Sequence, residues 1–414
     1  MAKILFFFYD IGIFLGDLYV YLFRFYSDKI NKLYKGRQKL WIDLEAFTDQ
    51  NKESIWIHCA SLGEFEQGRP LIEMIKEKYP QKKIILSFFS PSGYEIRKDY
   101  TGADVVIYLP SDRTKYISKI VRLGNPSVFI FVKYEFWWRL IQTLMSHKIR
   151  VVLISGVFRK SDYFFHPIFK PFQKLLMKFD AIYVQDYESS EVLEHHGFTN
   201  HFCVGDTRID RVIQNKSQSK LEDRWLDLVK GKTVIVYGSV WISDMKIVQN
   251  VINTFPDFIH IIAPHDIEQV NINQISGLID KPSDLYSATE WRTNILIINN
   301  IGLLMSLYGL AKYVYVGGGF GDGIHNILEP AVFGVPVFFG PNHKKFNEAL
   351  ALKFLGASYA IQSFEEIVSE ISEMEKNPNE YQKVSQILTS YFEKNRGATE
   401  KIYTYIEPIL KNPL

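Results

Sequence analysis

The residues with the clearest chemical potential lie in a glycine-rich stretch, YVGGGFGDGIHNILEPAVFGVPVFFGP, from Tyr315 to Pro341. Its five closely spaced glycines follow a β-branched and aromatic run, and glycine lets a backbone adopt positive φ and approach a ligand closely. We expect a helix to start at Asn326–Ala331, where unpaired amides and the helix dipole favour a phosphate. Glu329 would then be placed to bind sugar hydroxyls. The stretch predicts a nucleotide-phosphate site, although an ordinary tight β-α connection has similar glycine spacing.

A second polar group, Ser61 to Glu64, follows the apolar run IWIHC and precedes a helical pattern. Because a strand end and a helix start meet there, Glu64 is a candidate general base that helix amides could hold near a sugar hydroxyl. The same spacing fits a capping box, with Ser61 as the cap and Glu64 three residues later. The residues alone leave both interpretations open.

Short β-rich runs alternate with helical patterns from Ile55 onward, which predicts parallel sheets with crossover helices. The first series is IWIHC, KIILSF, VVIYL, VFIFV, VVLIS, AIYVQ and FCVG. After a polar segment, QNKSQSKLEDRW, the second series is TVIVYG, FIHIIA, NILIIN, YVYVG and VPVFFG. The expected fold class is therefore α/β, with two Rossmann-like domains facing a central cleft, since such sheets bind ligands at the carboxyl ends of their strands.

The length of 414 residues also favours about two domains, because a single hydrophobic core stops growing below that size. We expect an apolar helix and basic segment at 1–40, an acceptor-binding domain at 41–212, a linker at 213–230, a nucleotide-binding domain at 231–390 and a helix at 391–414 that could return to the first domain. The formal net charge of +2 argues against a chain that binds nucleic acid as a whole. Cys59 and Cys203 have no metal-ligand spacing, and we expect both to be small buried residues.

The N-terminal segment from Ile4 to Phe25 is almost wholly apolar, but Lys3, Asp10, Asp17 and Arg24 interrupt it at intervals of seven. On a helix these four charges form one narrow stripe. Two acids near the middle of a spanning helix would be costly in lipid, so a helix lying in the membrane interface is favoured. The basic cluster that follows is of the kind attracted to anionic lipid headgroups. The alternative is a helix that packs on its own domain.

Ordered segments along the chain resemble the transferases of 3-deoxy-D-manno-octulosonic acid (Kdo), which add this sugar to lipid A precursors. IWIHCASLGEFEQGRPLIEMIKEKYP, with LSFFSPSGYE after it, resembles the start of that family's sequence pattern. VFIFVKYEFWWRLI resembles its E-T-E-L-W segment, VGDTRID its G-x-x-K-x-D motif and IIAPHD its P-R-H segment. GDGIHNILEPAVFGVPVFFGP closely follows its G-G-H-N-x-L-E-P-A pattern and the succeeding G-P. The likeness spans nearly the whole chain.

The resemblance implies a GT-B glycosyltransferase that moves Kdo from CMP-Kdo to a lipid A precursor, without a bound metal or other cofactor. It places the protein on the cytoplasmic face of the inner membrane, with the acceptor in the N-terminal half and the nucleotide in the C-terminal half. Glu64 falls on the family's catalytic base, and Arg208 on a lysine thought to stabilise the transition state. The positions that match the CMP contacts are Pro264, His265, Ile301, Gly302, Leu303, Asn326, Ile327, Leu328 and Glu329.

The chain also departs from the family pattern. Lys133 replaces the first glutamate of E-T-E-L-W, which reverses a charge assigned to transition-state stabilisation, whereas Glu135 keeps the second acid. His265 replaces the arginine of P-R-H, so we expect the donor-phosphate contact to be weaker or to come from Lys344 or Lys345. Two alternatives stay open: another GT-B transferase or a sugar-nucleotide epimerase, and a membrane-bound scaffold that has lost catalysis.

Overall fold

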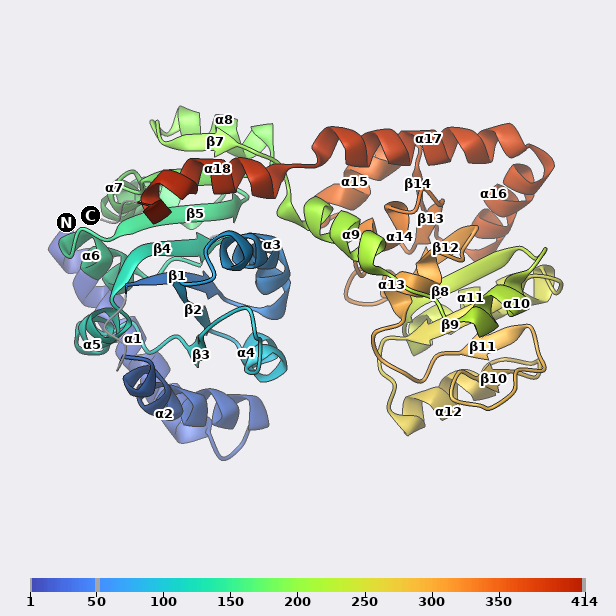
Figure 1. Cartoon of the computed structure of the whole chain (residues 1–414), viewed down its shortest axis with the longest axis horizontal. Coiled ribbons are helices and arrows are strands. Elements are labelled where there is room, and N and C mark those ends of the chain that lie inside the picture. The colour runs from blue at the N-terminus through green and yellow to red at the C-terminus, as the bar shows by residue number, and fades with distance from the viewer. Residues whose placement is uncertain (1, 49–52, 134, 412–414) are drawn as a thin grey trace. The chain divides into compact units, whose positions relative to one another are not determined.

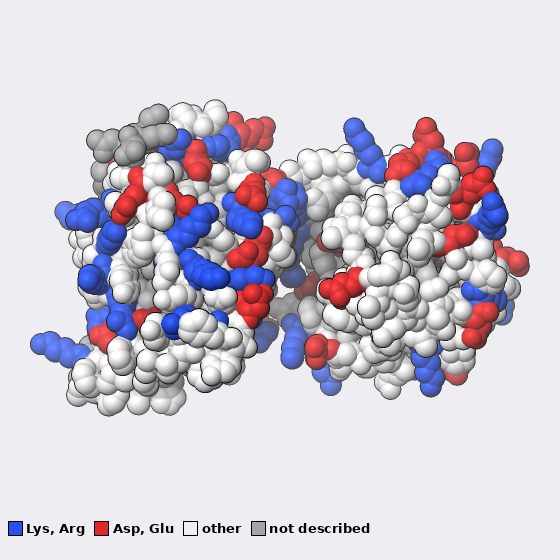
Figure 2. All heavy atoms as spheres, turned by 90° about the horizontal axis from the view of Figure 1, so that it is seen from below, with Lys and Arg blue, Asp and Glu red and all other residues white. Residues whose placement is uncertain are grey.

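The chain divides into two compact units, each built around one parallel sheet (Figure 1). The computed structural model describes residues 2–48, 53–133 and 135–411. Unit 1 comprises Met1–Arg211 with Arg396–Leu414, and unit 2 comprises Val212–Asn395. On the face seen in Figure 2, basic and acidic side chains are interspersed over both units. The predicted α/β class with two Rossmann-like domains is confirmed.

Unit 1 contains a seven-stranded sheet in the order β3-β2-β1-β4-β5-β6-β7. All of its strand pairs are parallel. The strands are β1 (Ser54–Cys59), β2 (Lys83–Phe88), β3 (Val105–Tyr108), β4 (Pro126–Val132), β5 (Arg150–Gly156), β6 (Ala181–Val184) and β7 (His201–Cys203). The central strand β1 is buried along its whole length, as expected for a parallel sheet that is covered on both faces.

The connections between these strands are mostly helical. The helices of unit 1 are α1 (Ala2–Phe23), α2 (Asp28–Thr48), α3 (Leu62–Lys78), α4 (Pro91–Arg97), α5 (Thr114–Gly124), α6 (Trp138–Ser146), α7 (Lys170–Leu176), α8 (Tyr187–His195) and α18 (Ala398–Lys411), with two short 3-10 turns at Tyr163–Phe165 and Pro167–Phe169. Helix α9 (Thr207–Gln218) carries the chain from unit 1 into unit 2.

Helix α1 turns its charged stripe toward its own unit. Asp10 pairs with Arg139 at 2.5 Å, and Asp17 pairs with Arg113 at 2.7 Å. Tyr9 also donates a hydrogen bond of 2.6 Å to the buried Asp112. The stripe predicted from the heptad spacing is therefore a docking face.

Much of the remaining surface of α1 is apolar and exposed. Its exposed side chains include Ile4, Phe7, Phe8, Ile11, Phe14, Leu15, Leu18, Tyr19, Leu22 and Phe23. By length and composition alone, Lys3–Phe23 is also apolar enough to cross a membrane. The combination of a paired polar face and an open apolar face is typical of a helix lying along an interface.

Unit 2 contains the second parallel sheet, in the order β10-β11-β9-β8-β12-β13-β14. Its strands are β8 (Val234–Val240), β9 (Ile259–Pro264), β10 (Asp284–Leu285), β11 (Ile295–Ile297), β12 (Tyr313–Val316), β13 (Val337–Phe339) and β14 (Ser358–Ala360). Its helices are α10 (Asp223–Val229), α11 (Met245–Thr254), α12 (Gln269–Gly277), α13 (Leu304–Tyr308), α14 (Leu328–Ala331), α15 (Asn347–Phe354), α16 (Phe364–Lys376) and α17 (Pro378–Asn395), with a 3-10 turn at Ile242–Asp244.

Helix α18 returns to the core of unit 1 (Figure 1). Its side chains Ile402, Ile406 and Leu410 are buried in the same hydrophobic cluster as residues of β1, β2 and β4. The Asp210 carboxylate accepts hydrogen bonds from the first amides of this segment, Gly397 N–H at 2.6 Å and Thr399 N–H at 2.7 Å. The end of the chain thus completes the domain with which the chain begins.

All twelve runs predicted as strands form strands. Two short strands were not predicted from the sequence: β10, with two residues, and β14, with three. The expected linker at 213–230 contains the end of α9 and all of α10. The basic segment expected up to residue 40 forms part of a second helix, α2, which extends to Thr48. The helix expected at Asn326–Ala331 was wrong in extent, because α14 begins only at Leu328.

Candidate functional site

Glu64 lies in the first turn of α3, directly after the carboxyl end of β1. Its carboxylate accepts a hydrogen bond from the Ala60 backbone N–H. Burial raises the pKa of Glu64 above its ordinary value; the Ala60 N–H opposes this rise, whereas the neighbouring Glu135 carboxylate adds to it. A carboxylate with a raised pKa is a stronger proton acceptor. Ser61 is the helix cap, but its side chain makes no capping bond, and Glu64 accepts from the Ala60 N–H instead of the Ser61 N–H, so the two bonds of a capping box are not formed.

Three further ionisable side chains interact with Glu64. Glu135 follows β4 and raises the pKa of Glu64, whereas His58 and Lys133 lower it. The fully buried His58, 1% exposed, directs its Nε2 atom toward a Glu135 carboxylate oxygen at 3.4 Å. The structure therefore groups three of the predicted catalytic residues in unit 1 and adds His58, which the sequence did not single out.

Lys133 has an unusual backbone conformation. Its φ is +66°, in the left-handed region, and its N–H donates to the Ile154 carbonyl at 2.9 Å. A side chain with a Cβ in this region costs on the order of 1–3 kcal/mol, and such residues concentrate at functional sites. This strained residue directly follows β4, at the same strand end as Glu135. Tyr134, between them, lies outside the described residues.

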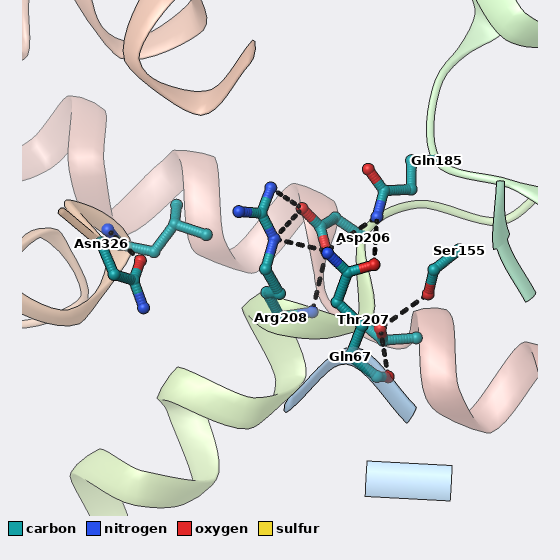
Figure 3. A network of polar contacts seen from close by, with 8 residues as sticks. Gln67, Ser155, Gln185, Asp206, Thr207, Arg208 and Asn326 are labelled. Carbon is teal, nitrogen blue, oxygen red and sulfur yellow. Dashed lines mark hydrogen bonds and ion pairs between the residues drawn. The ribbon is translucent and has the colours of Figure 1, made fainter. Parts of the chain in front are cut away.

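Arg208 lies at the start of α9 and is bound by a neighbouring acid (Figure 3). Its Nε and Nη2 atoms lie 2.9 and 2.7 Å from an Asp206 carboxylate oxygen. The intervening Thr207 is buried and bonds the Gln67 carbonyl at 2.7 Å and the Ser155 hydroxyl at 3.1 Å. The guanidinium is therefore held in a fixed place, with part of its charge offset by Asp206.

The glycine-rich loop of unit 2 begins where β12 ends and is anchored by a buried acid. Asp244, fully buried, accepts hydrogen bonds from the Tyr315 hydroxyl at 2.7 Å, the Gly318 N–H at 3.0 Å and the Trp241 N–H at 2.8 Å. A Cβ at Gly317 would lie 2.5 Å from the Ser239 carbonyl oxygen. The loop is thus packed tightly against the carboxyl end of β8.

Two of the other glycines are required by the loop itself. Gly318 has φ +88°, and a Cβ on Gly319 would lie 2.5 Å from the Gly340 backbone nitrogen. Close approach of backbone to backbone explains these glycines, in addition to any approach of a ligand.

The end of the loop differs from the expected helix start. Asn326 accepts a hydrogen bond from the Leu328 N–H at 3.1 Å and donates one to Glu329 at 3.1 Å. The side chains of Ile327 and Leu328 are fully buried, so only their backbone could contact a nucleotide. Because α14 has four residues, it provides no extended row of free amides for a phosphate.

The other predicted nucleotide contacts lie on two loops of unit 2. Pro264 ends β9 and is buried, whereas His265 after it is exposed. Ile301 is 86% exposed, and Gly302 has φ +92° in the turn before Leu303. Ile301 therefore offers an open apolar side chain, and Gly302 a backbone that few other residues could adopt.

His265 belongs to an aromatic stack at the carboxyl ends of β8, β9 and β12. Its ring centroid lies 4.3 Å from that of Trp241 and 4.4 Å from that of His325. Trp241 Nε1–H donates a 2.9 Å hydrogen bond to His325 Nε2. Burial lowers the pKa of His325 to about 4, and burial also lowers the pKa of His265. At neutral pH the position of the family's arginine thus holds an uncharged ring.

Lys344 and Lys345, the alternative phosphate contacts, line a cavity of 1080 Å³ that also reaches Gly321 and Asp322 of the glycine-rich loop. Among the described residues, no group of three or more His, Cys, Asp and Glu could hold a metal ion. Cys59 is buried and Cys203 half-buried, and both are free thiols.

Known proteins of one family resemble this chain. Residues 35–211 match the model of the family described as 3-deoxy-D-manno-octulosonic-acid transferase (kdotransferase). The 3-deoxy-D-manno-octulosonic acid transferase of Aquifex aeolicus is 27% identical over 360 residues, which cover 83% of this chain and 93% of that protein. That of Haemophilus influenzae is 22% identical over 376 residues, 87% and 88% of the two chains. Residues 35–211 thus match the Kdo transferase family, and the likeness to whole Kdo transferases extends over most of the chain.

Solved structures share the fold of this chain. The UDP-GlcNAc 2-epimerase of Neisseria meningitidis has a TM-score of 0.62 and 15% identity over 87% of this chain and 100% of that chain. A glycosyltransferase of Rickettsia africae has a TM-score of 0.55 and 13% identity, with the same coverage. At such low identity the likeness concerns the fold alone, and it agrees with the predicted GT-B class.

Proposed function

We propose that this protein moves Kdo from CMP-Kdo to a hydroxyl of a lipid A precursor, in lipopolysaccharide core biosynthesis. The observation that carries the proposal is the Glu64 carboxylate, held at the end of β1 with a raised pKa among Glu135, His58 and Lys133. The family match over residues 35–211 supports Kdo as the transferred sugar.

The proposed reaction is a direct displacement. Glu64 takes the proton of the acceptor hydroxyl while the oxygen of that hydroxyl forms a bond to the anomeric carbon of Kdo. The bond from that carbon to the CMP phosphate oxygen breaks, and CMP leaves with the electron pair. The geometry of the reaction resembles that of an inverting glycosidase in which an alcohol replaces water. Lys133 and Arg208 are the cations that would offset negative charge on the donor carboxylate or departing phosphate.

For the donor, we propose that CMP binds in unit 2 at the loops that carry the nine matched positions. The 1080 Å³ cavity supports this placement, because Lys344, Lys345 and Lys353 line it beside the glycine-rich loop. The aromatic stack of Trp241, His265 and His325 would then replace the cation expected at the P-R-H position.

For the location, we propose that α1 lies on the cytoplasmic face of the inner membrane with its exposed apolar face in the lipid. Its charged stripe supports this orientation, because Asp10 and Asp17 pair with residues of unit 1. The basic cluster that follows α1 has less free positive charge for anionic lipids than expected, because two of its side chains are engaged within the chain. Lys32 pairs with Asp28, and Arg37 bonds the Leu109 carbonyl at 3.2 Å.

The test is a transfer assay with CMP-Kdo and a defined lipid A precursor, read by mass spectrometry. Replacement of the base in Glu64→Gln should lower kcat by roughly 10²- to 10⁴-fold, while CMP binding is retained. Glu66→Gln is the matched control, because Glu66 lies on the same helix and pairs with Arg97 at 2.9 Å.

Near-normal transfer by Glu64→Gln would remove Glu64 as the base. Turnover of UDP-GlcNAc without transfer to an acceptor would favour the epimerase alternative. A wild-type chain that releases no CMP in the presence of the lipid acceptor would support the scaffold alternative.

A further inference from the structure

A row of hydrogen-bonded side chains crosses the buried interior of unit 1 and ends at His58, beside Glu135. Trp56 Nε1 lies 2.8 Å from the Ser87 hydroxyl, and that hydroxyl lies 2.9 Å from His58 Nδ1. Trp56 and Ser87 are fully buried, and His58 is 1% exposed. The row joins β1 to its neighbour β2, where His58 and Ser87 are paired in register.

The chemistry of the three groups favours one arrangement of the protons. An indole N–H can only donate, so the Ser87 oxygen accepts from Trp56. That oxygen keeps a second lone pair, so Ser87 could either donate its proton to His58 Nδ1 or accept one from it. The first arrangement places an N–H on Nε2, the nitrogen that faces the Glu135 carboxylate, whereas the second would turn a bare lone pair toward that carboxylate. A neutral imidazole with an accepting Nδ1 carries its proton on Nε2.

Among the residues that the structure describes, His58 Nε2 has no hydrogen-bond partner, although it is buried. The nearest oxygen is Oε2 of Glu135, at 3.4 Å, and the side chain of Glu135 is 31% exposed. Phe129 and Phe131 pack around the imidazole ring. An N–H on Nε2 is therefore aimed at Oε2 of Glu135, which the Trp137 indole N–H also approaches, at 3.4 Å.

We propose that the relay Trp56–Ser87–His58 orients Glu135 as an anion beside Glu64, so that Glu135 sets the basicity of the catalytic carboxylate. His58 is then a positioning residue, which acts through Glu135. This inference rests on the proposed role of Glu64 as the base. It is supported by the effect of the Glu135 charge, which raises the pKa of Glu64.

The first test measures the proton position and needs no substrate. The ¹⁵N chemical shifts of histidine-labelled protein distinguish the Nε2–H tautomer from the Nδ1–H tautomer and from imidazolium, and a His58→Gln spectrum assigns the signal. We expect the Nε2–H tautomer at pH 7.5 in the wild type and its partial loss in Ser87→Ala. An Nδ1–H tautomer or an imidazolium in the wild type would overturn the relay.

The second test uses the pH dependence of kcat/KM, whose acid limb reports the base of the free enzyme. Glu135→Gln should move this limb to lower pH by roughly one unit, because the negative charge that raises the pKa of Glu64 is gone. His58→Phe should lower kcat by about 10- to 100-fold, with the donor KM unchanged, because Glu135 loses its positioning contact. His58→Gln, which keeps an N–H donor, should recover most of the loss.

The matched control is His195→Gln, because His195 is an exposed histidine of α8. Its profile should equal that of the wild type. Equal acid limbs for Glu135→Gln and wild type, or no recovery in His58→Gln despite a wild-type melting temperature, would overturn the inference. Absence of Kdo transfer by the wild type would instead count against the proposed function, and the tautomer measurement remains valid in that case.

Discussion

One buried histidine, His260, makes the stability of unit 2 sensitive to acid. His260 is fully buried, with the Tyr237 hydroxyl 3.0 Å from its Nδ1 and the Phe255 carbonyl 2.9 Å from its Nε2. Burial lowers the pKa of His260 to about 4. Since the ordinary pKa is about 6.5, the unfolded chain takes up a proton that the folded domain resists.

The contribution of His260 to the free energy of unfolding is therefore complete above the pKa of the unfolded chain. It falls as the pH drops toward the pKa of His260 in the folded domain. We expect His260 to lower the free energy of unfolding by roughly 2 kcal/mol between pH 7 and pH 5. Thermal unfolding at several pH values checks this. The variant His260→Gln should melt lower at pH 7.5 but lose less stability on acidification, whereas the exposed His195→Gln should keep the wild-type slope. An unchanged slope in His260→Gln would contradict the assignment.

At the same scale, the sequence indicated only part of the candidate site. Glu64 was predictable because its position follows from a local strand-to-helix pattern. His58, Trp241 and Asp244 were not, because their roles depend on partners far along the chain. Ser87 is 29 residues from His58, and Tyr315 is 71 residues from Asp244. A histidine at the end of the run IWIHC, three residues before Ser61, was the one available signal.

Among the elements, α2 depends on a close approach to the sheet of unit 1. Gly36 of α2 packs against Tyr108 at the end of β3, and a Cβ there would lie 2.1 Å from the Tyr108 ring. We expect Gly36→Ala to destabilise unit 1 by about 1–3 kcal/mol, because the ring must move. Chemical denaturation of the full chain measures the change.

Gly12→Ala is the matched control for that substitution. Gly12 lies within α1 and has no atom within 4 Å of its added Cβ. Alanine there should be neutral or stabilising by about 0.5–1 kcal/mol, since it favours the helix. Similar destabilisation in both variants would mean that the contact with Tyr108 is not the cause.

The elements were more predictable than the site, and the exceptions have a physical reason. Long apolar runs such as VFIFV form strands because burial on both sheet faces requires them. The edge strand Ser358–Ala360 has three residues and two half-buried positions, so no hydrophobic run marks it. Likewise, Asn326 uses its side chain to bond the Leu328 N–H, which explains why the helix starts later than the glycine pattern indicates.

At the scale of the whole molecule, the exposed apolar face of α1 predicts how the protein meets a bilayer. We expect Phe8→Asp with Leu15→Asp to weaken binding to anionic phospholipid vesicles by at least about tenfold, because two exposed apolar side chains are lost to the lipid. Vesicle co-sedimentation gives the affinity. Phe354→Asp is the control, because Phe354 is 92% exposed in unit 2. Equal losses in the two proteins would argue against α1 as the lipid contact.

The return of α18 to unit 1 also determines the order in which the protein can be completed during synthesis. The ribosome releases residues 1–211 first, yet Ile402, Ile406 and Leu410 fill part of their core. Domains generally fold as they emerge, so unit 2 can mature while unit 1 still lacks its last helix. Until α18 leaves the exit tunnel, part of the apolar surface beneath it stays uncovered. Unit 1 therefore starts to form before unit 2 and receives its last helix after it.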